Sequence, residues 1–406
     1  MPFRQVATAP VGSEACALDI EAAYRTVPVR PEHKRVMVVM HHNVFWVEHC
    51  VTFGLRSAHG LQGEIADCAL DIWRSKGVGP FNKWVDDING FRFPSENGSF
   101  PSPHSSFLFD YDRASALKLI EHLNIPWHTS KGHDFQPIFD FIGFIWDLAT
   151  RSVTLSDGKR LKCKGRVDSA LAMFTSSRMS LNDVQRLHGS LSHITFVYVN
   201  MRSFLPPISQ FAASFSSNPF GTRFPPPSFT SALRSWSEVL SGPTPPRILT
   251  PKGPVIDVDL WVDASTDWGV GLILGEKFAA FKLLPGWRGP SRDIGWLETL
   301  AVELAAILLG ILGYQGQRIL LRSDNQGVIG AHEKGRSRNF ESNLSLRRTL
   351  FCCLDSDLSL ALEYVESALN LADPISRGIL PEASKAWDYV LPLPDELKQY
   401  LIQVVH

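Results

Sequence analysis

Residues 258–274 read VDLWVDASTDWGVGLIL, and this stretch decides the fold of the C-terminal part of the chain. Val258 to Val262 reads as a strand that runs into Asp263, and a glycine-broken strand follows at residues 270–274. Downstream, the apolar spacing predicts a helix over residues 294–312, a strand over 318–322, a helix over 344–354 and a strand over 360–365. Strands mixed with helices in this way are typical of an α/β domain.

Four carboxylates punctuate these C-terminal elements. Asp263 and Asp324 end predicted strands, Glu298 lies near the start of the long predicted helix, and Asp373 lies in NLADPISRG. Such carboxylates can converge on one pair of metal ions, the arrangement needed to split a phosphodiester with a metal-bound water. Each acid alone has a simpler explanation, as a loop cap or as a solvated Glu favoured by the helix dipole. Their order on these elements favours a two-metal site, and hard oxygen ligands suit Mg²⁺ or Mn²⁺.

A second acidic group stands near the N-terminus. Asp19 ends the apolar strand ACALD, and Asp86 and Asp87 sit at a tight turn within WVDDI. Neighbouring aspartates beside apolar residues are costly to desolvate unless a positive charge neutralises them. Two divalent ions bridged by carboxylates would do so, and they would suit in-line phosphoryl transfer. The alternative is an Asp-Asp hairpin turn exposed to water. Around it we predict strands at 17–20, 36–39 and 45–47, a helix at 65–73 and a hairpin at 83–88.

The sequence motifs around these aspartates resemble those of a known family. LDIEAAYRTVPVRPEHK (residues 18–34), FGLRSA (53–58) and WVDD (84–87) resemble motifs A, B and C of a reverse transcriptase palm. FIGFIWDLATRSVTLSDGKR (residues 141–160) resembles the hairpin that leads into the thumb. The resemblance implies that Asp19 and Asp86 hold two metal ions with Asp87 beside them. It also implies that Tyr24 is the steric gate against a ribonucleotide, and that Phe53 and Gly54 pack beneath the incoming nucleotide.

The C-terminal motifs resemble a ribonuclease H domain. VDAS (residues 262–265), WLETLAVELA (296–305), RSDNQGVI (322–329) and LNLADPISR (369–377) match its four carboxylate motifs in order, particularly in the version fused to reverse transcriptases of DIRS-like (tyrosine-recombinase) retrotransposons. The resemblance implies that Asp263, Glu298, Asp324 and Asp373 are the metal ligands, with two Mg²⁺ or Mn²⁺ ions per active site. Glu303 rivals Glu298, but it lies five residues on, about 140° around the helix, so both cannot face one site. The sequence WLE at residues 296–298 favours Glu298.

We therefore expect an α+β palm-type reverse transcriptase core followed by an α/β ribonuclease H-like domain. Because motif A begins at residue 18, the fingers are expected to be largely missing, as in an N-terminally truncated fragment. The predicted segments are a partial palm over 1–157, a helical thumb or connector over 158–240, a Pro-rich linker over 241–254, the ribonuclease H-like domain over 255–378 and a C-terminal tail over 379–406. Between Asp324 and Asp373 the one histidine, His332, is interpreted as a surface residue.

Charge points to the connector as a nucleic-acid surface. The whole chain has a net charge of −1, but residues 158–250 hold 11 Lys and Arg against 3 Asp and Glu. A basic segment of this kind suits a phosphate backbone, and a solvated helical face is the alternative. The densest run, offered as phosphate contacts, comprises Lys159, Arg160, Lys162, Lys164 and Arg166.

Three functional hypotheses follow. The chain is an RNA-directed DNA polymerase with ribonuclease H activity, a polymerase-dead ribonuclease H, or a non-catalytic nucleic-acid-binding remnant. The expected partners are an RNA template, a DNA primer, an RNA–DNA hybrid and deoxynucleoside triphosphates, with no membrane. Six cysteines without a C-x-x-C pair, no apolar run of about 18 residues and no signal peptide predict a soluble intracellular protein with reduced thiols.

Overall fold

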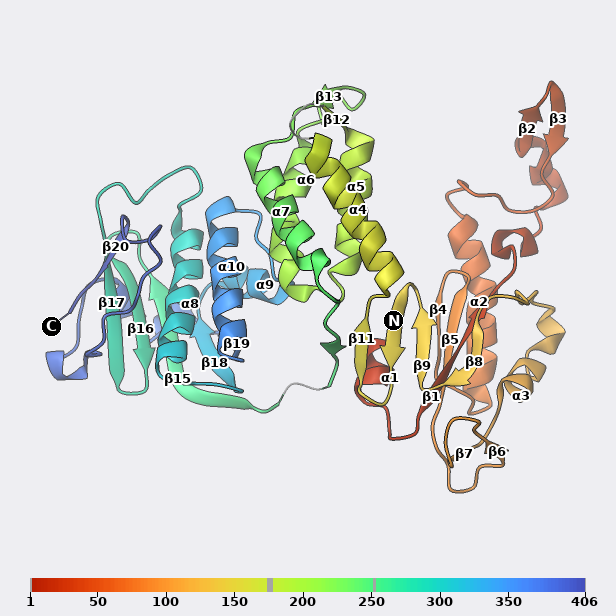
Figure 1. The fold of residues 1–406 in the computed structure, drawn as a ribbon, viewed down its shortest axis with the longest axis horizontal. Helices are drawn as coiled ribbons and strands as arrows, with labels where there is room; N and C mark the ends of the chain where they lie inside the picture. Colours follow the sequence, from red (N-terminus) through yellow and green to blue (C-terminus); the bar gives the residue numbers. More distant parts are fainter. Residues whose placement is uncertain (1, 174–177, 251–252, 406) are drawn as a thin grey trace. The chain divides into compact units, whose positions relative to one another are not determined.

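The computed structural model describes residues 2–173, 178–250 and 253–405, and the chain divides into two compact units (Figure 1). The first unit comprises residues 1–160 and 243–251, and the second comprises residues 161–242 and 252–406. Nearly all of the predicted connector and the whole predicted ribonuclease H-like domain thus belong to the second unit. The predicted linker is divided between the units, and its residues 251 and 252 lie outside the described residues, as do residues 174–177 of the predicted connector.

The first unit is built on a four-stranded sheet in the order β4-β5-β1-β8. Its strands are β1 (Glu14–Asp19), β4 (Phe81–Trp84), β5 (Asp87–Arg92) and β8 (His133–Gln136). Helix α2 (Ala58–Ser75) packs beside it, with the Trp73 ring stacked on Phe81 at a centroid distance of 4.0 Å. The predicted hairpin at 83–88 is therefore β4–β5, and the predicted helix at 65–73 is the second half of α2.

A second sheet of the first unit recruits part of the predicted linker. Its order is β14-β11-β10-β9, formed by β9 (Ile138–Phe141), β10 (Phe144–Asp147), β11 (Ser152–Thr154) and β14 (Arg247–Ile248). Strand β14 pairs antiparallel with β11, with Ser152 opposite Ile248. A stretch that proline and glycine identify as a connection thus contributes an edge strand, because two residues suffice when the partner strand is already in place.

The hairpin of β2 (Val38–His41) and β3 (Val44–Val47) is exposed along both strands. Strand β2 starts two residues after the predicted strand, because residues up to Val36 form the 3₁₀ helix η2 (Pro31–Val36). The smaller elements of this unit are α1 (Phe3–Ala7), η1 (Ala23–Thr26), β6 (Phe100–Pro101), β7 (Leu108–Phe109), α3 (Arg113–Lys118) and η3 (Glu121–Leu123).

The connector is mostly helical, as predicted. It contains α4 (Asp157–Met173), β12 (Met179–Ser180), α5 (Leu181–Ile194), η4 (Val199–Phe204), α6 (Pro206–Ala213), β13 (Thr222–Arg223) and α7 (Pro227–Ser241). A capping box between Ser180 and Asp183 starts α5. Pro206 and Pro227 occupy first turns of helices, where the missing N–H has no helical partner to lose. The proline clusters thus begin helices here.

The C-terminal part forms a six-stranded sheet in the order β19-β18-β15-β16-β17-β20. The strands are β15 (Val255–Ala264), β16 (Gly269–Leu274), β17 (Lys277–Leu283), β18 (Arg318–Ser323), β19 (Ser359–Tyr364) and β20 (Leu401–Gln403). Strands β15, β18 and β19 are parallel, whereas β16, β17 and β20 add antiparallel neighbours. Strand β20 comes from the predicted C-terminal tail, so the sheet extends beyond residue 378.

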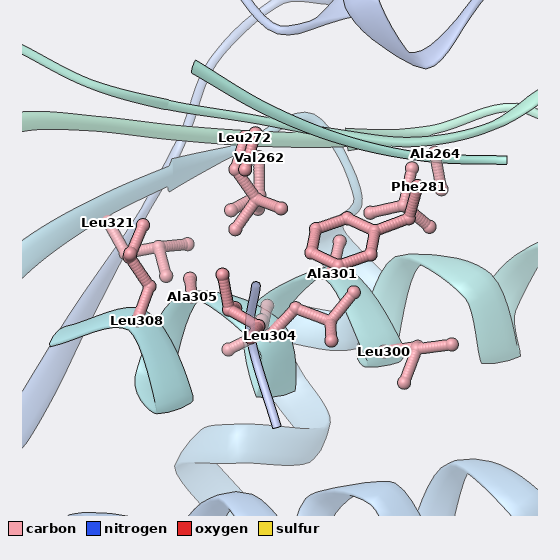
Figure 2. Close-up of a cluster of buried hydrophobic side chains, with 14 of the residues drawn as sticks. Val262, Ala264, Leu272, Phe281, Leu300, Ala301, Leu304, Ala305, Leu308 and Leu321 are labelled. Atoms are coloured by element: carbon pink, nitrogen blue, oxygen red, sulfur yellow. The ribbon is translucent and has the colours of Figure 1, made fainter. Parts of the chain in front are cut away.

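Helix α8 (Ile294–Ile311) covers one face of this sheet and forms the main core. Figure 2 shows its side chains, among them Leu304 and Leu308, directed at Val262, Leu272 and Leu321 of the sheet. Burying each such leucine stabilises the fold by about 1.5–3 kcal/mol. Among the described residues α8 is the one helix long and apolar enough to cross a membrane, and 72% of that stretch is buried inside the protein, as expected for a core helix.

Five further helical elements belong to the described part of this domain. Helix α9 (Gln326–Lys334) follows β18, and α10 (Phe340–Asp355) packs against α8. The short helix α11 (Asp373–Ser376), preceded by η5 (Ser367–Leu369), packs on β15–β17 and forms a second small core with Phe278 and Ala280. The last segment also contains η6 (Ala383–Lys385).

Candidate functional site

Three of the four predicted C-terminal carboxylates meet at one end of the sheet. Asp263 comes from β15, Glu298 from the second turn of α8, and Asp324 directly follows β18. One ligand oxygen of each lies within 4.8 Å of the others. Asp263 and Glu298 are 3% and 5% exposed, while Asp324 is half-buried. The cluster is therefore reachable from solvent on the Asp324 side.

Two neutral side chains hold Asp263 in place. Asn370 donates from Nδ2 to Oδ1 of Asp263 over 3.0 Å, and it also donates to the backbone carbonyl of Val262 over 3.0 Å. The hydroxyl of Ser376 donates to Oδ2 of Asp263. Both carboxylate oxygens are thus oriented by groups that carry no charge, so the negative charge of the cluster is not cancelled by them.

Two acids of the cluster, Glu298 and Asp263, have raised pKa values. Burial raises the pKa of Glu298 to about 9, and the neighbouring Asp263 and Asp324 add to the effect. Burial also raises the pKa of Asp263 to about 7, although the bond from Ser376 opposes this shift. A positively charged species among them would reverse both shifts, because it favours the ionised form of each acid.

The cluster fits a divalent metal ion. Glu298 accepts a hydrogen bond from the backbone N–H of Ala264, but its Oε2 is buried without any hydrogen-bond partner. A buried oxygen of this kind is costly unless something satisfies it. Carboxylate oxygens at this spacing are the hard ligands that Mg²⁺ and Mn²⁺ prefer. A cation bound to the three acids would satisfy Oε2 and neutralise the cluster.

The fourth predicted ligand, Asp373, is engaged elsewhere. Its two carboxylate oxygens accept from the Arg377 guanidinium, with Nε at 2.9 Å from each oxygen and Nη2 at 2.8 Å from Oδ1. Asp373 is absent from the group of three ligands defined above, although it is near enough to raise the pKa of Asp263. The structure thus brings three acids together and leaves the fourth at the rim.

Glu303, the rival to Glu298, belongs to a different network. It is fully buried and accepts from Arg348, whose Nε and Nη2 lie 2.5 Å and 2.8 Å from its two oxygens. The Ser345 hydroxyl donates to Oε2 of Glu303 over 2.6 Å. This network ties α8 to α10, so Glu303 holds two helices together and Glu298 faces the cluster.

The three N-terminal aspartates occupy the end of the β1–β5 ladder. Asp19 pairs directly opposite Asp87, and Asp86 lies in the turn between β4 and β5. Desolvation, then the charges of Asp86 and Asp19, raise the pKa of Asp87. Lys131 lies 3.3 Å from Oδ1 of Asp19. Among the described residues, only the C-terminal acids place three ligand atoms within 4.8 Å of one another.

The turn that carries Asp86 has an unusual backbone. Val85 has φ of +60°, a left-handed conformation in which a β-branched residue is strained. Two-residue hairpin turns need such a conformation and usually take Gly there. Strain of this type is often stored at functional sites.

Two of the three predicted nucleotide-binding residues, Tyr24 and Phe53, line an open hollow of the first unit. Tyr24 and Phe53 meet edge to face with ring centroids 5.0 Å apart. Both rings line a cavity of about 610 Å³, together with Val38 and Thr52. Phe53 is 85% exposed, and Gly54 follows it with φ of +89°, so the backbone there needs glycine.

The predicted phosphate contacts lie on the first turns of α4, across the boundary of the two units. Lys159, Lys162 and Arg166 are exposed. Arg160 pairs with Asp157 at 3.0 Å, and Lys164 pairs with Asp168 at 2.6 Å. Three of the five cations are thus exposed to solvent, whereas Arg160 and Lys164 form ion pairs along the helix.

Sequence reasoning missed the residues that position the acids. Asn370, Ser376 and Arg377 lie inside the LNLADPISR motif, so their closeness to Asp373 was the available signal. Lys131 carried no signal, because its contact with Asp19 spans more than a hundred residues. The interpretation of His332 as a surface residue holds only in part: the residue is half-buried, its Nε2 is buried without a hydrogen-bond partner, and burial lowers its pKa to about 4.

Comparison with known proteins gives distant structural likenesses. No family model matches the sequence, and no curated protein matches it. A foamy viral protease–reverse transcriptase dRH in complex with double-stranded DNA has a TM-score of 0.42 and 13% identity, over 90% of this chain and 59% of that one. A foamy viral protease–reverse transcriptase in complex with double-stranded DNA has a TM-score of 0.40 and 16% identity, over 91% of this chain and 71% of that one. The same kind of protein in complex with an RNA/DNA hybrid has a TM-score of 0.32 and 12% identity, over 92% of this chain and 68% of that one.

This chain therefore spans about three-fifths of the length of the first of these structures. The similarity of the chain to all three structures is low, so function is inferred from the side-chain geometry of the acidic cluster.

Proposed function

We propose that the C-terminal domain is a ribonuclease H that hydrolyses the RNA strand of RNA–DNA hybrids with two divalent ions. One observation carries the proposal: three carboxylates from β15, α8 and the end of β18 converge within 4.8 Å, and Oε2 of the buried Glu298 has no partner. A buried cluster of like charges with an unsatisfied oxygen destabilises a protein, so its presence favours a metal-binding role.

The chain's own residues prepare the site for this chemistry. Asn370 and Ser376 fix both oxygens of Asp263, and the Ala264 N–H fixes one oxygen of Glu298. The half-buried Asp324 leaves an approach for a phosphodiester from solvent. Divalent ions bound here would neutralise the scissile phosphate and lower the pKa of a water that attacks it. Asp263 and Glu298 must lose their protons to bind the ions, so activity should rise with pH.

The test is hydrolysis of an end-labelled RNA–DNA hybrid in Mg²⁺. The native chain should cleave only the RNA strand, and Asp324→Asn should reduce the rate at least about 100-fold because a metal ligand loses its charge. Asp355→Asn, an exposed acid at the end of α10, is the matched control and should cleave at the native rate. Equal rates for the native chain and Asp324→Asn would refute the assignment.

We also propose that the first unit descends from, or retains, the palm of an RNA-directed DNA polymerase of a DIRS-like retrotransposon. Support comes from Asp19 opposite Asp87 with Asp86 in the adjoining strained turn, and from Tyr24 and Phe53 beside an open hollow. Asp19, Asp86 and Asp87 would bind Mg²⁺ and a deoxynucleoside triphosphate, with Tyr24 as the steric gate.

Primer extension on poly(rA)–oligo(dT) distinguishes the remaining alternatives. Extension that disappears in Asp86→Asn but persists in the exposed control Asp71→Asn would establish a polymerase. Hybrid cleavage without extension would identify a polymerase-dead ribonuclease H. Hybrid binding with neither reaction would identify a non-catalytic nucleic-acid-binding protein.

A further inference from the structure

Arg377 occupies both oxygens of Asp373, the one of the four predicted C-terminal ligands that does not join the cluster. Its Nε lies 2.9 Å from each oxygen of Asp373, and its Nη2 lies 2.8 Å from Oδ1. The hydrogen bond to Asp373, and then the charges of Asp373, Asp263 and Asp267, raise the pKa of Arg377, so the guanidinium lies in the negative field of the site. The single positive charge of the Arg377 side chain therefore already lies beside the acids.

The segment that carries this pair is fixed closely against the sheet. Gly271, opposite Asp263 across the β15–β16 ladder, has no room for a side chain, because a Cβ there would lie 2.7 Å from the backbone nitrogen of Ser376. At the other end of α11, Gly378 has φ of +83° and lies against the Trp268 ring. The backbone of α11 is thus held on both sides, and the freedom lies in the long side chain of Arg377, which is 56% exposed.

We propose that Arg377 is an internal counter-ion that competes with the second divalent ion for Asp373. The inference rests on the proposed two-ion site. The first ion binds Asp263, Glu298 and Asp324, which are already assembled, and the second binds only when Asp373 is released by the guanidinium. Arg377 is a positioning residue in this scheme, and it makes the two ions bind in order.

The physical chemistry of the pair suits such an exchange. The Arg377 side chain is 56% exposed and Asp373 is half-buried, so solvent screens their attraction and a divalent ion can displace the guanidinium. The guanidinium can then move into solvent without leaving a buried donor unsatisfied. By contrast, Glu303 is fully buried with Arg348, and a buried pair is costly to break. Of these two Arg–carboxylate pairs, the one at the site is the one that can open.

The experiment measures Mn²⁺ binding in the absence of nucleic acid, by calorimetry and by electron paramagnetic resonance of free Mn²⁺. The native chain should show a tighter and a weaker class of site in the C-terminal domain. Arg377→Gln should lower the Kd of the weaker class about five- to tenfold, because a positive charge no longer competes with the ion, and should change the tighter class less than twofold. Arg377→Lys, which keeps the charge but lacks the planar fork, should give an intermediate Kd.

Two controls separate competition from other effects. Lys398→Ala removes one charge from an exposed ion pair of the same unit and should leave both Kd values unchanged. Asp373→Asn should abolish the weaker class, and adding Arg377→Gln to it should then leave the tighter class within about twofold. A weaker class with the same Kd in the native chain and in Arg377→Gln would overturn the proposal.

The binding readout also keeps this proposal apart from the proposed function. Mn²⁺ binding with the expected Arg377 effect but no hybrid cleavage would sustain the competition and refute the ribonuclease. Cleavage with an unchanged weaker class would do the reverse. A native chain that binds no Mn²⁺ would overturn both.

Discussion

Replacing Glu298 by Gln should stabilise the metal-free protein while it removes metal binding. Glu298 is 5% exposed and its Oε2 has no partner. Its ionised form is therefore a buried charge that only a cation can satisfy. Gln has the same shape and no charge, so the substitution isolates the electrostatic cost of the acid.

The structure sets the size of this effect. Burial and the neighbouring acids raise the pKa of Glu298 from an ordinary 4.5 to about 9. The folded state thus binds the proton more tightly than the unfolded state, and stability falls as pH rises between these two values. At pH 7, about 2.5 units above the ordinary pKa and at about 1.36 kcal/mol per unit, the loss is about 3 kcal/mol. Gln does not titrate, so it escapes this loss.

The assay is urea unfolding of both proteins in EDTA at pH 5 and at pH 7.5. The native chain should lose stability between the two pH values, and Glu298→Gln should lose much less; the slope that remains belongs to Asp263, whose pKa is also raised, to about 7. At pH 7.5, a divalent ion at about 100 times its Kd should restore about 2.7 kcal/mol to the native chain only. Parallel pH profiles for the two proteins would refute the reasoning.

Three further outcomes follow from other contacts. Glu303→Gln, the same substitution as Glu298→Gln on the same helix, should destabilise the fold by about 3–5 kcal/mol in urea unfolding, because it leaves the half-buried Arg348 charge without its partner. Mn²⁺ binding should persist in this variant. Gly271→Ala should displace α11, since the new Cβ would lie 2.9 Å from Cβ of Ile375, so Tm and Mn²⁺ affinity should both fall; a native Tm would contradict the packing. Val85→Gly should raise stability by up to about 1 kcal/mol by relieving the positive φ, and a lower urea midpoint would contradict the strain.

The elements that sequence predicted well are those with a local signal. Strand β15, helix α8 and strand β18 each show an apolar pattern over five or more residues, and the structure has them within a few residues of the predicted bounds. Strands β14 and β20 span two and three residues, and they exist only because a partner strand offers its edge. No local pattern encodes such pairing.

The candidate site divides in the same way. The identity of the acids could be read from motif order, and helical geometry showed that Glu298 and Glu303 cannot share a site. Which partners each acid takes could not be read, because Ser376 and Asn370 reach Asp263 across more than a hundred residues. The pairing of Asp373 with Arg377 is local, but its competition with the cluster is visible only in three dimensions. The catalytic roles themselves stay predictions.

The return of residues 243–251 to the first unit has a practical consequence for anyone dividing this protein. The chain passes between the units three times, near residues 160, 242 and 251. No single cut therefore yields two intact folding units: a fragment starting at residue 161 keeps β14 but loses β11, which covers it, and a fragment ending at residue 160 leaves the edge of β11 bare. Exchange of either unit for that of another protein would need matched junctions at all three places.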